Sequence, residues 1–78
     1  MIAIEDLQLA AALLRESSLS AAARALDVTP PALSMRLRRL EAELGLSLAN
    51  RSARRLALTP EGERFAREAV RLLGQIEE

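Results

Sequence analysis

Residues 20–45, SAAARALDVTPPALSMRLRRLEAELG, contain the pattern that decides the fold. Ser20 is a good N-cap for a short helix that ends at Leu26, because its hydroxyl can accept a backbone N–H of the first turn. Thr29 caps a second, longer helix whose first residue is Pro30, where a missing N–H costs nothing. Two helices of this length joined by so tight a turn predict a helix-turn-helix.

The longer helix is expected to end near Glu43, with Gly45 as its C-cap. One narrow stripe of this helix is apolar and faces the expected core: Leu33, Leu37, Leu40 and Leu44. At 100° per residue the opposite face holds Pro31, Met35, Arg38 and Ala42, with Ser34 and Arg39 on its shoulders. The outward face therefore combines apolar, hydroxyl and guanidinium groups.

A first helix is expected from about Ile4 to about Arg15. It has two apolar stripes, Leu7, Ala11 and Leu14 on one face and Leu9, Ala12 and Leu13 on another. A helix that is apolar on two faces is covered on two sides. We therefore expect this helix to lie in the middle of the domain.

Residues 46–58 have a different period. Leucines at 46, 48, 56 and 58 alternate with small residues, which is typical of strands, and a polar basic tip lies between them. The pattern predicts a small β-hairpin wing, although no β-branched residue supports it before Thr59. A loop without a strand ladder is the alternative.

A last helix is expected from Thr59 onward, with Pro60 at its first position and Glu61 in its first turn. One of its apolar stripes consists of Phe65, Ala69, Leu72 and Ile76, and its neighbour consists of Ala66, Val70 and Leu73. Both have the 4-3 spacing of a coiled-coil seam. We predict dimerisation through Phe65, Ala69, Leu72, Leu73 and Ile76, the alternative being packing inside one protomer. Because the helix continues to Glu78, the chain is expected to be a fragment or to fray there.

Composition excludes several classes of function. The 78 residues allow one domain, and the absence of Cys and His excludes disulfides and the usual zinc sites. No apolar run is long enough to span a bilayer, and no signal peptide is visible, so a cytoplasmic protein without a membrane partner is expected. The residues show no catalytic constellation, which predicts that the chain is not an enzyme and needs no cofactor.

The charge distribution indicates a nucleic-acid partner. The formal net charge is zero, but residues 34–55 carry +4 between flanks of −2 each. All 11 basic residues are Arg, whose planar guanidinium suits bidentate contacts. A basic centre between acidic flanks favours contact with phosphates.

Eleven residues are the predicted DNA contacts. We expect base readout by the start of the longer helix and positioning on phosphates by the arginines: Thr29, Pro30, Pro31, Ser34, Met35, Arg36, Arg38, Arg39, Arg51, Arg54 and Arg55. The N-terminus of this helix is also expected to favour a phosphate. Plainer interpretations remain open: Ser34 as a solvent-facing helix residue, Met35 as a packing residue, Arg36 and Arg39 in surface ion pairs with Glu43 or Glu41, and Arg54 and Arg55 as solubilising charges.

Two segments resemble the N-terminal domain of LysR-type transcriptional regulators. Residues 22–34 are similar to the family's AAxxLxxSQPAxS segment, and residues 40–51 to its LExxLGxxLFxR segment. The departures are Pro30 for the usual base-contacting Gln, Met35 for the Arg that commonly follows the Ser, and Ala49 for the Phe. The missing Gln means that its base contact does not carry over to this chain.

The resemblance implies a mainly α-helical fold, with a winged helix-turn-helix at residues 1–58 and a linker helix for dimerisation at residues 59–78. It also implies a bacterial transcription regulator that binds double-stranded DNA as a homodimer, or as a higher oligomer in a full-length parent. A small-molecule effector would act only through a C-terminal domain absent from this chain. The rival hypothesis is a helix-turn-helix interaction module that dimerises without binding DNA.

Overall fold

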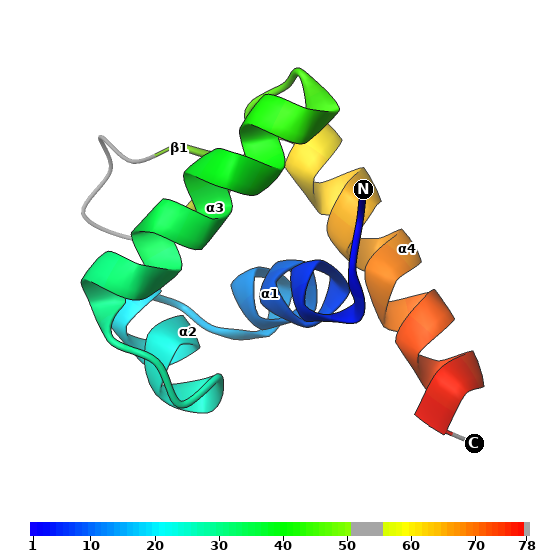
Figure 1. Cartoon of the computed structure of the whole chain (residues 1–78), viewed down its shortest axis with the longest axis horizontal. Coiled ribbons are helices and arrows are strands. Elements are labelled where there is room, and N and C mark those ends of the chain that lie inside the picture. Colours follow the sequence, from blue (N-terminus) through cyan, green and yellow to red (C-terminus); the bar gives the residue numbers. More distant parts are fainter. Residues whose placement is uncertain (51–55, 78) are drawn as a thin grey trace.

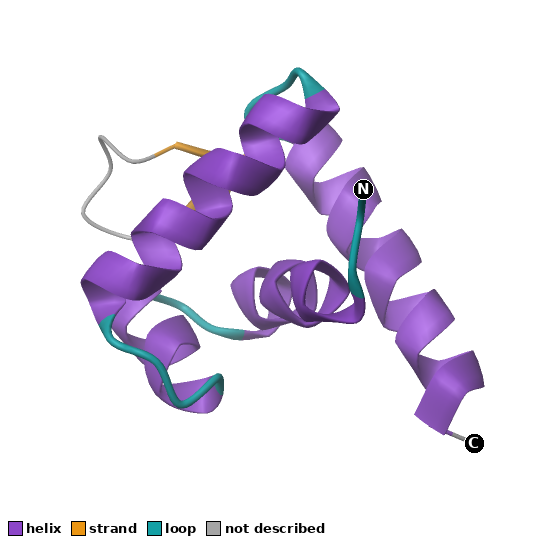
Figure 2. Cartoon of the chain, viewed as in Figure 1, coloured by secondary structure: helices purple, strands orange, loops and turns teal. Residues whose placement is uncertain are grey.

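The computed structural model describes residues 1–50 and 56–77, and of residues 75–77 it describes the backbone alone. The described residues form four helices and a small antiparallel hairpin, as expected: α1 (Ile4–Arg15), α2 (Leu19–Ala25), α3 (Pro30–Leu44), β1 (Ala49–Asn50), β2 (Ala57–Leu58) and α4 (Pro60–Glu77). Helix dominates, and the strands lie beside α3 (Figure 2). The predicted winged helix-turn-helix with a following helix is confirmed.

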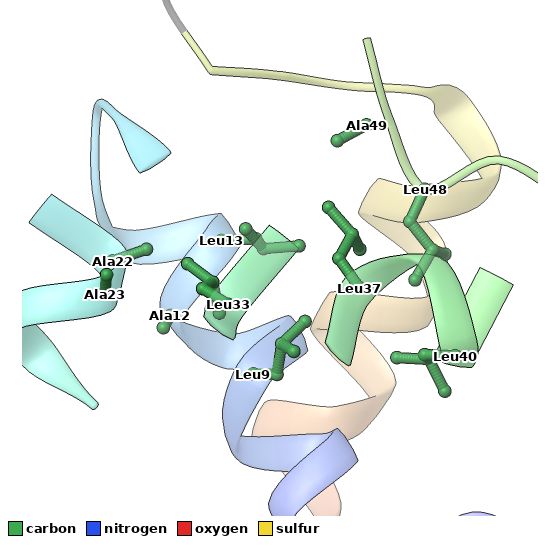
Figure 3. Packing of buried hydrophobic residues seen from close by; sticks show 10 residues of the cluster. All are labelled: Leu9, Ala12, Leu13, Ala22, Ala23, Leu33, Leu37, Leu40, Leu48 and Ala49. Atoms are coloured by element: carbon green, nitrogen blue, oxygen red, sulfur yellow. The ribbon is translucent and has the colours of Figure 1, made fainter. Parts of the chain in front are cut away.

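Helix α1 lies at the centre of the molecule, with α2 and α3 on one side and α4 along the other (Figure 1). On the α3 side, leucines of α1 and α3 form one buried cluster with Leu48, the residue before β1 (Figure 3). Five side chains there are almost completely buried: Leu9, Leu33, Leu37, Leu40 and Leu48. These contacts fix the angle at which α3 presents its other face to solvent.

The other face of α1 packs against α4. Here alanines meet across the interface, Ala10 from α1 with Ala66 and Ala69 from α4, and larger side chains surround them. Small side chains let two helices approach closely. The expectation that α1 is covered on two sides is confirmed, and α4 is a part of the folded domain.

Helix α2 begins two residues earlier than the sequence predicted. Its N-cap is Ser18, whose hydroxyl accepts the N–H of Ala21 at 3.0 Å, and Ser20 is an exposed residue of the first turn. The earlier start places Leu19 in the helix, where its side chain packs against the core. Burial of this leucine explains why Ser18, and not Ser20, caps the helix.

The connection from α2 to α3 turns through Asp27, which has a left-handed backbone conformation (φ 57°). Asp tolerates this region better than most residues. The N–H of Val28 then donates to the carbonyl of Ala23, which closes the end of α2. At the other end of α3, Gly45 (φ 71°) is the predicted C-cap, and the helix ends at Leu44, one residue beyond the expected Glu43.

The wing has a real but short ladder, so the alternative of a loop without strands is wrong. Ala49 pairs with Leu58 and Asn50 with Ala57. The strands are shorter than the alternation suggested, because Leu46 is exposed in the turn after α3 while Leu48 is buried in the core. The ladder thus begins only after Leu48 has anchored the chain.

Candidate nucleic-acid interface

The start of α3 is built as an exposed tip. Thr29 caps the helix by accepting the N–H of Ala32 at 3.2 Å, and Pro30 and Pro31 occupy the first two helical positions. Thr29, Pro30 and Pro31 are all exposed. The tip is therefore compact and can approach a partner surface closely.

The first turn of α3 offers few backbone donors to the phosphate expected at the helix N-terminus. The two prolines have no N–H. The N–H of Ala32 is bonded to the Thr29 hydroxyl, and that of Leu33 donates to the Thr29 carbonyl at 3.0 Å. A phosphate at the tip would meet the helix dipole but no N–H from the first four residues of α3, so binding there depends mainly on side chains.

The outward face of α3 carries the residues predicted to read bases. Met35 is 62% exposed, Arg38 is exposed and Ser34 is half-buried. Ser34 lies on the side of α3 that also carries Glu41, two turns further on, and Glu41 bonds to the start of the wing. Because Met35 is exposed, its plainer interpretation as a packing residue is wrong.

Arg36 and Arg39 lie on the opposite shoulder of α3. Both are exposed, and together with Glu5 and Asp6 from the first turn of α1 they line a shallow depression. The acidic and basic residues lie some 30 positions apart in the sequence, and the fold brings them together. Nearby carboxylates reduce the local positive potential that a phosphate would meet.

A second depression lies between α2 and the tip of α3, and the sequence analysis missed it. Its lining includes Ser20, Arg24, Thr29 and Pro30. Ser20 and Arg24 are exposed and one helical turn apart on α2. Their i, i+4 spacing was a usable signal, but Arg24 was counted only as part of an acidic flank.

The base of the wing joins two helices. The N–H of Leu48 donates to Glu41 of α3 at 2.7 Å, and the hydroxyl of Thr59 donates to the carbonyl of Ser47 at 2.6 Å. The predicted wing contacts Arg51, Arg54 and Arg55 lie outside the described residues. Their assignment remains a prediction from the sequence.

The predicted dimer seam on α4 needs correction at two positions. Ala69 is 1% exposed and Leu73 is 6% exposed within a single protomer, so neither has surface left for a partner. Phe65 is half-buried and touches both core clusters, and Leu72 is half-buried on the same flank of α4. The side chain of Ile76 lies outside the described residues.

Two arginines of α4 are paired on its exposed side. Arg67 donates to Glu63 at 2.7 Å, and Arg71 donates to Glu68. The hydrogen bond from Arg71 lowers the pKa of Glu68 below its ordinary value, and the same bond raises the pKa of Arg71. These pairs leave the basic character of the molecule concentrated on α3 and the wing segment.

Within the described ranges, no cluster of Asp and Glu is arranged to hold a metal ion. No helix there has the length and apolar character that crossing a bilayer requires. The features that remain are an exposed helix tip, flanking guanidinium groups and a wing on a rigid helical core. They define a winged helix-turn-helix domain of the kind that presents one helix to a groove.

Comparison with known proteins identifies the family. The sequence profile described as "Bacterial regulatory helix-turn-helix protein, lysR family" matches residues 4–63. The HTH-type transcriptional regulator PtxR of Pseudomonas aeruginosa is 44% identical over 66 residues, which are 85% of this chain and 21% of PtxR. The chain belongs to the lysR family of bacterial regulatory helix-turn-helix proteins.

Solved structures agree with this assignment. The crystal structure of a BenM_DBD/benA site 1 DNA complex superposes with a TM-score of 0.91 at 34% identity, covering 97% of this chain and 85% of that one. The CbnR_DBD–DNA complex gives a TM-score of 0.88 at 32% identity, covering 97% and 87%. The chain thus matches isolated domains of this family nearly end to end, while it spans about a fifth of the length of PtxR.

Proposed function

We propose that this chain is the sequence-specific double-stranded DNA-binding domain of a bacterial transcription regulator. The observation that carries the proposal is the exposed tip and outward face of α3, held at a fixed angle by three buried leucines on its other side. A rigid helix with an exposed N-terminal half fits the major groove. The similar BenM and CbnR domains were solved in complex with DNA, which supports DNA as the partner of this chain.

Base readout falls to the side chains of α3, because its backbone donors are occupied. Ser34 can donate to or accept from a base edge, and Arg38 reaches a guanine or a phosphate. Pro31 and Met35 offer apolar contact to a thymine methyl. Pro30 and Met35 stand where the family usually has Gln and Arg, so the preferred sequence is expected to differ from that of relatives that retain them.

Phosphate contacts position the domain. We assign them to Arg36, Arg39, Arg51, Arg54 and Arg55, and add Ser20 and Arg24 because they line the depression beside the α3 tip. The acidic neighbours of Arg36 and Arg39 make those two the weaker contacts. The wing arginines are then the main anchors.

We further propose that the protein works as a homodimer in the bacterial cytoplasm, where its DNA partner is found. Residues 1–58 bind DNA, and residues 59–78 pair with a second copy through the flank of α4 that carries Phe65 and Leu72, extended by Ile76. Because the chain spans only a fifth of PtxR, we propose that a longer parent protein adds an effector domain for a small molecule.

Selection from a library of randomised duplexes tests the proposal. A specific regulator should enrich one motif and bind it about 10³-fold or more tighter than unrelated DNA. The rival hypothesis, a dimerisation module that does not bind DNA, expects no enriched motif and no retarded band in a gel shift. Binding without enrichment would contradict the specificity that we assign to α3.

A further inference from the structure

Two helices hold the base of the wing at once. From α3, Glu41 Oε2 accepts the N–H of Leu48 at 2.7 Å and the hydroxyl of Ser47 at 3.4 Å. From the residue before α4, the Thr59 hydroxyl donates to the carbonyl of Ser47 at 2.6 Å. The Thr59 N–H donates to the carbonyl of Leu48 at 3.0 Å, so both peptide groups at the wing base are fixed.

The Thr59 hydroxyl does two things at the same time. It accepts the N–H of Gly62 at 2.9 Å, which caps α4, while it donates its own proton to Ser47. Gly62 makes this arrangement possible, because a Cβ there would lie 1.9 Å from the carbonyl oxygen of Leu48. The first turn of α4 and the wing base are therefore in direct backbone contact.

The described part of the hairpin is short. Between residues 49–50 and 57–58 its ladder consists of two residue pairs, and a two-stranded hairpin by itself is marginal in water. The described strands are therefore held in place mainly by the contacts at their base. Leu48, which is 1% exposed, anchors one side of the base in the core, and Thr59 anchors it to α4.

We infer that Thr59 is a positioning residue for DNA binding. Its hydroxyl holds the wing base against the first turn of α4, so the phosphate contacts made from residues 51–55 depend on where α4 begins. The inference rests on the proposed function, because it requires wing arginines that contact DNA. It also implies that the helix that pairs two protomers is linked directly to the wing of each one.

The test compares two substitutions at this position. Thr59→Val removes the hydroxyl and keeps the shape, whereas Thr59→Ser keeps the hydroxyl. Thr59→Val is expected to weaken DNA binding roughly two- to tenfold, the effect of one hydrogen bond, and to flatten its salt dependence. Thr59→Ser should bind as the unsubstituted protein does.

DNA binding by Thr59→Val and Thr59→Ser is then measured again in a protein that also carries Arg54→Ala and Arg55→Ala. If Thr59 acts by positioning the wing, Thr59→Val has little further effect there, because the contacts that it positions are gone. Leu14→Ala, at the α1–α4 contact, is the control for lowered stability and should act equally in both backgrounds. Thr59→Asp replaces Thr59→Val if the valine variant does not fold, because a carboxylate still caps α4 but cannot donate to Ser47.

Three results would overturn the inference. An equal effect of Thr59→Val in both backgrounds would make Thr59 a stabilising cap and no more. A Thr59→Ser variant as weak as Thr59→Val would remove the role of the hydroxyl. Unsubstituted protein that does not bind DNA would overturn the proposed function and this inference with it, whereas the first two results leave the proposed function intact.

Discussion

Ser34 is half-buried on the wing side of α3, one turn from the tip, and its short side chain reaches a base only if α3 approaches closely. The compact tip of Thr29 and two prolines allows that approach. Arg38 lies one turn further along and reaches further. The two residues therefore sample different depths of a groove.

We predict that Ser34→Ala reduces the difference in binding free energy between specific and non-specific DNA by about 1–3 kcal/mol, because it removes a hydrogen bond to a base edge. Arg54→Ala should instead weaken both kinds of binding about equally, because phosphates carry no sequence information. Binding arrays over randomised sites measure both effects. If Ser34→Ala leaves the preferred sequence and its margin unchanged, Arg38 with Pro31 and Met35 is the better assignment.

Gly62 and Gly74 form a matched pair for stability. A Cβ at Gly62 would meet the Leu48 carbonyl at 1.9 Å, while one at Gly74 would meet nothing within 4 Å. Gly62→Ala is expected to lower the free energy of unfolding by about 1–3 kcal/mol through overpacking. Gly74→Ala should raise it by roughly 0.5–1 kcal/mol through helix propensity. Urea denaturation measures the free energy of unfolding of both variants. Equal changes at the two positions would contradict the close contact between Gly62 and the Leu48 carbonyl.

At the scale of elements, helix periods and caps made most of the fold predictable. The apolar stripes of residues 4–15 and 29–44 and the caps at Thr29 and Gly45 lie where the pattern placed them. The start of α2 was missed, because burial of Leu19 outweighed a second serine that was equally able to cap. The local sequence cannot show which of Ser18 and Ser20 caps α2, because the choice depends on the contact that Leu19 makes with the core.

The interface was harder to predict than the fold. The period of 65–76 identified an apolar surface on α4 but could not say which flank α1 covers, so Ala69 and Leu73 were assigned to a dimer seam and are buried in the protomer. Likewise, no pattern in the sequence places Arg36 and Arg39 beside Glu5 and Asp6. Such pairings depend on the angle between helices, which the sequence does not display.

We predict that Leu72→Glu abolishes dimerisation, because it places a carboxylate without a partner at the apolar flank of α4. Arg67→Gln, on the other side of the same helix, should leave the association unchanged. Sedimentation velocity at several protein concentrations distinguishes the two variants. A Leu72→Glu protein that sediments as the unsubstituted one does would exclude this flank as the seam.

At the scale of the whole molecule, the balance of charge sets how binding responds to salt. The chain has no net charge, so attraction to DNA must come from the local excess of arginine. If each of the six arginines that we assign to phosphates makes its contact, the logarithm of the affinity falls with the logarithm of salt at a slope of roughly −5.4 per protomer, about −0.9 for each phosphate.

The individual arginines should not contribute equally to that slope. Arg36→Ala and Arg39→Ala are expected to change it less than Arg54→Ala and Arg55→Ala, because Glu5 and Asp6 lie beside the first pair. Filter binding at four salt concentrations measures each variant. A slope near zero for the unsubstituted protein would contradict the phosphate contacts altogether. If all four variants changed the slope by the same amount, the role of the acidic neighbours would be contradicted.

The two prolines and the occupied N–H groups at the tip of α3 also determine how that tip is hydrated. A surface with few free main-chain donors holds few ordered water molecules through its backbone, and poorly ordered water is released at little cost when an apolar group takes its place. Removing water from the tip of α3 as it enters a groove therefore costs little free energy. Water that remains in the interface would gather instead around the hydroxyl of Ser34 and the guanidinium of Arg38.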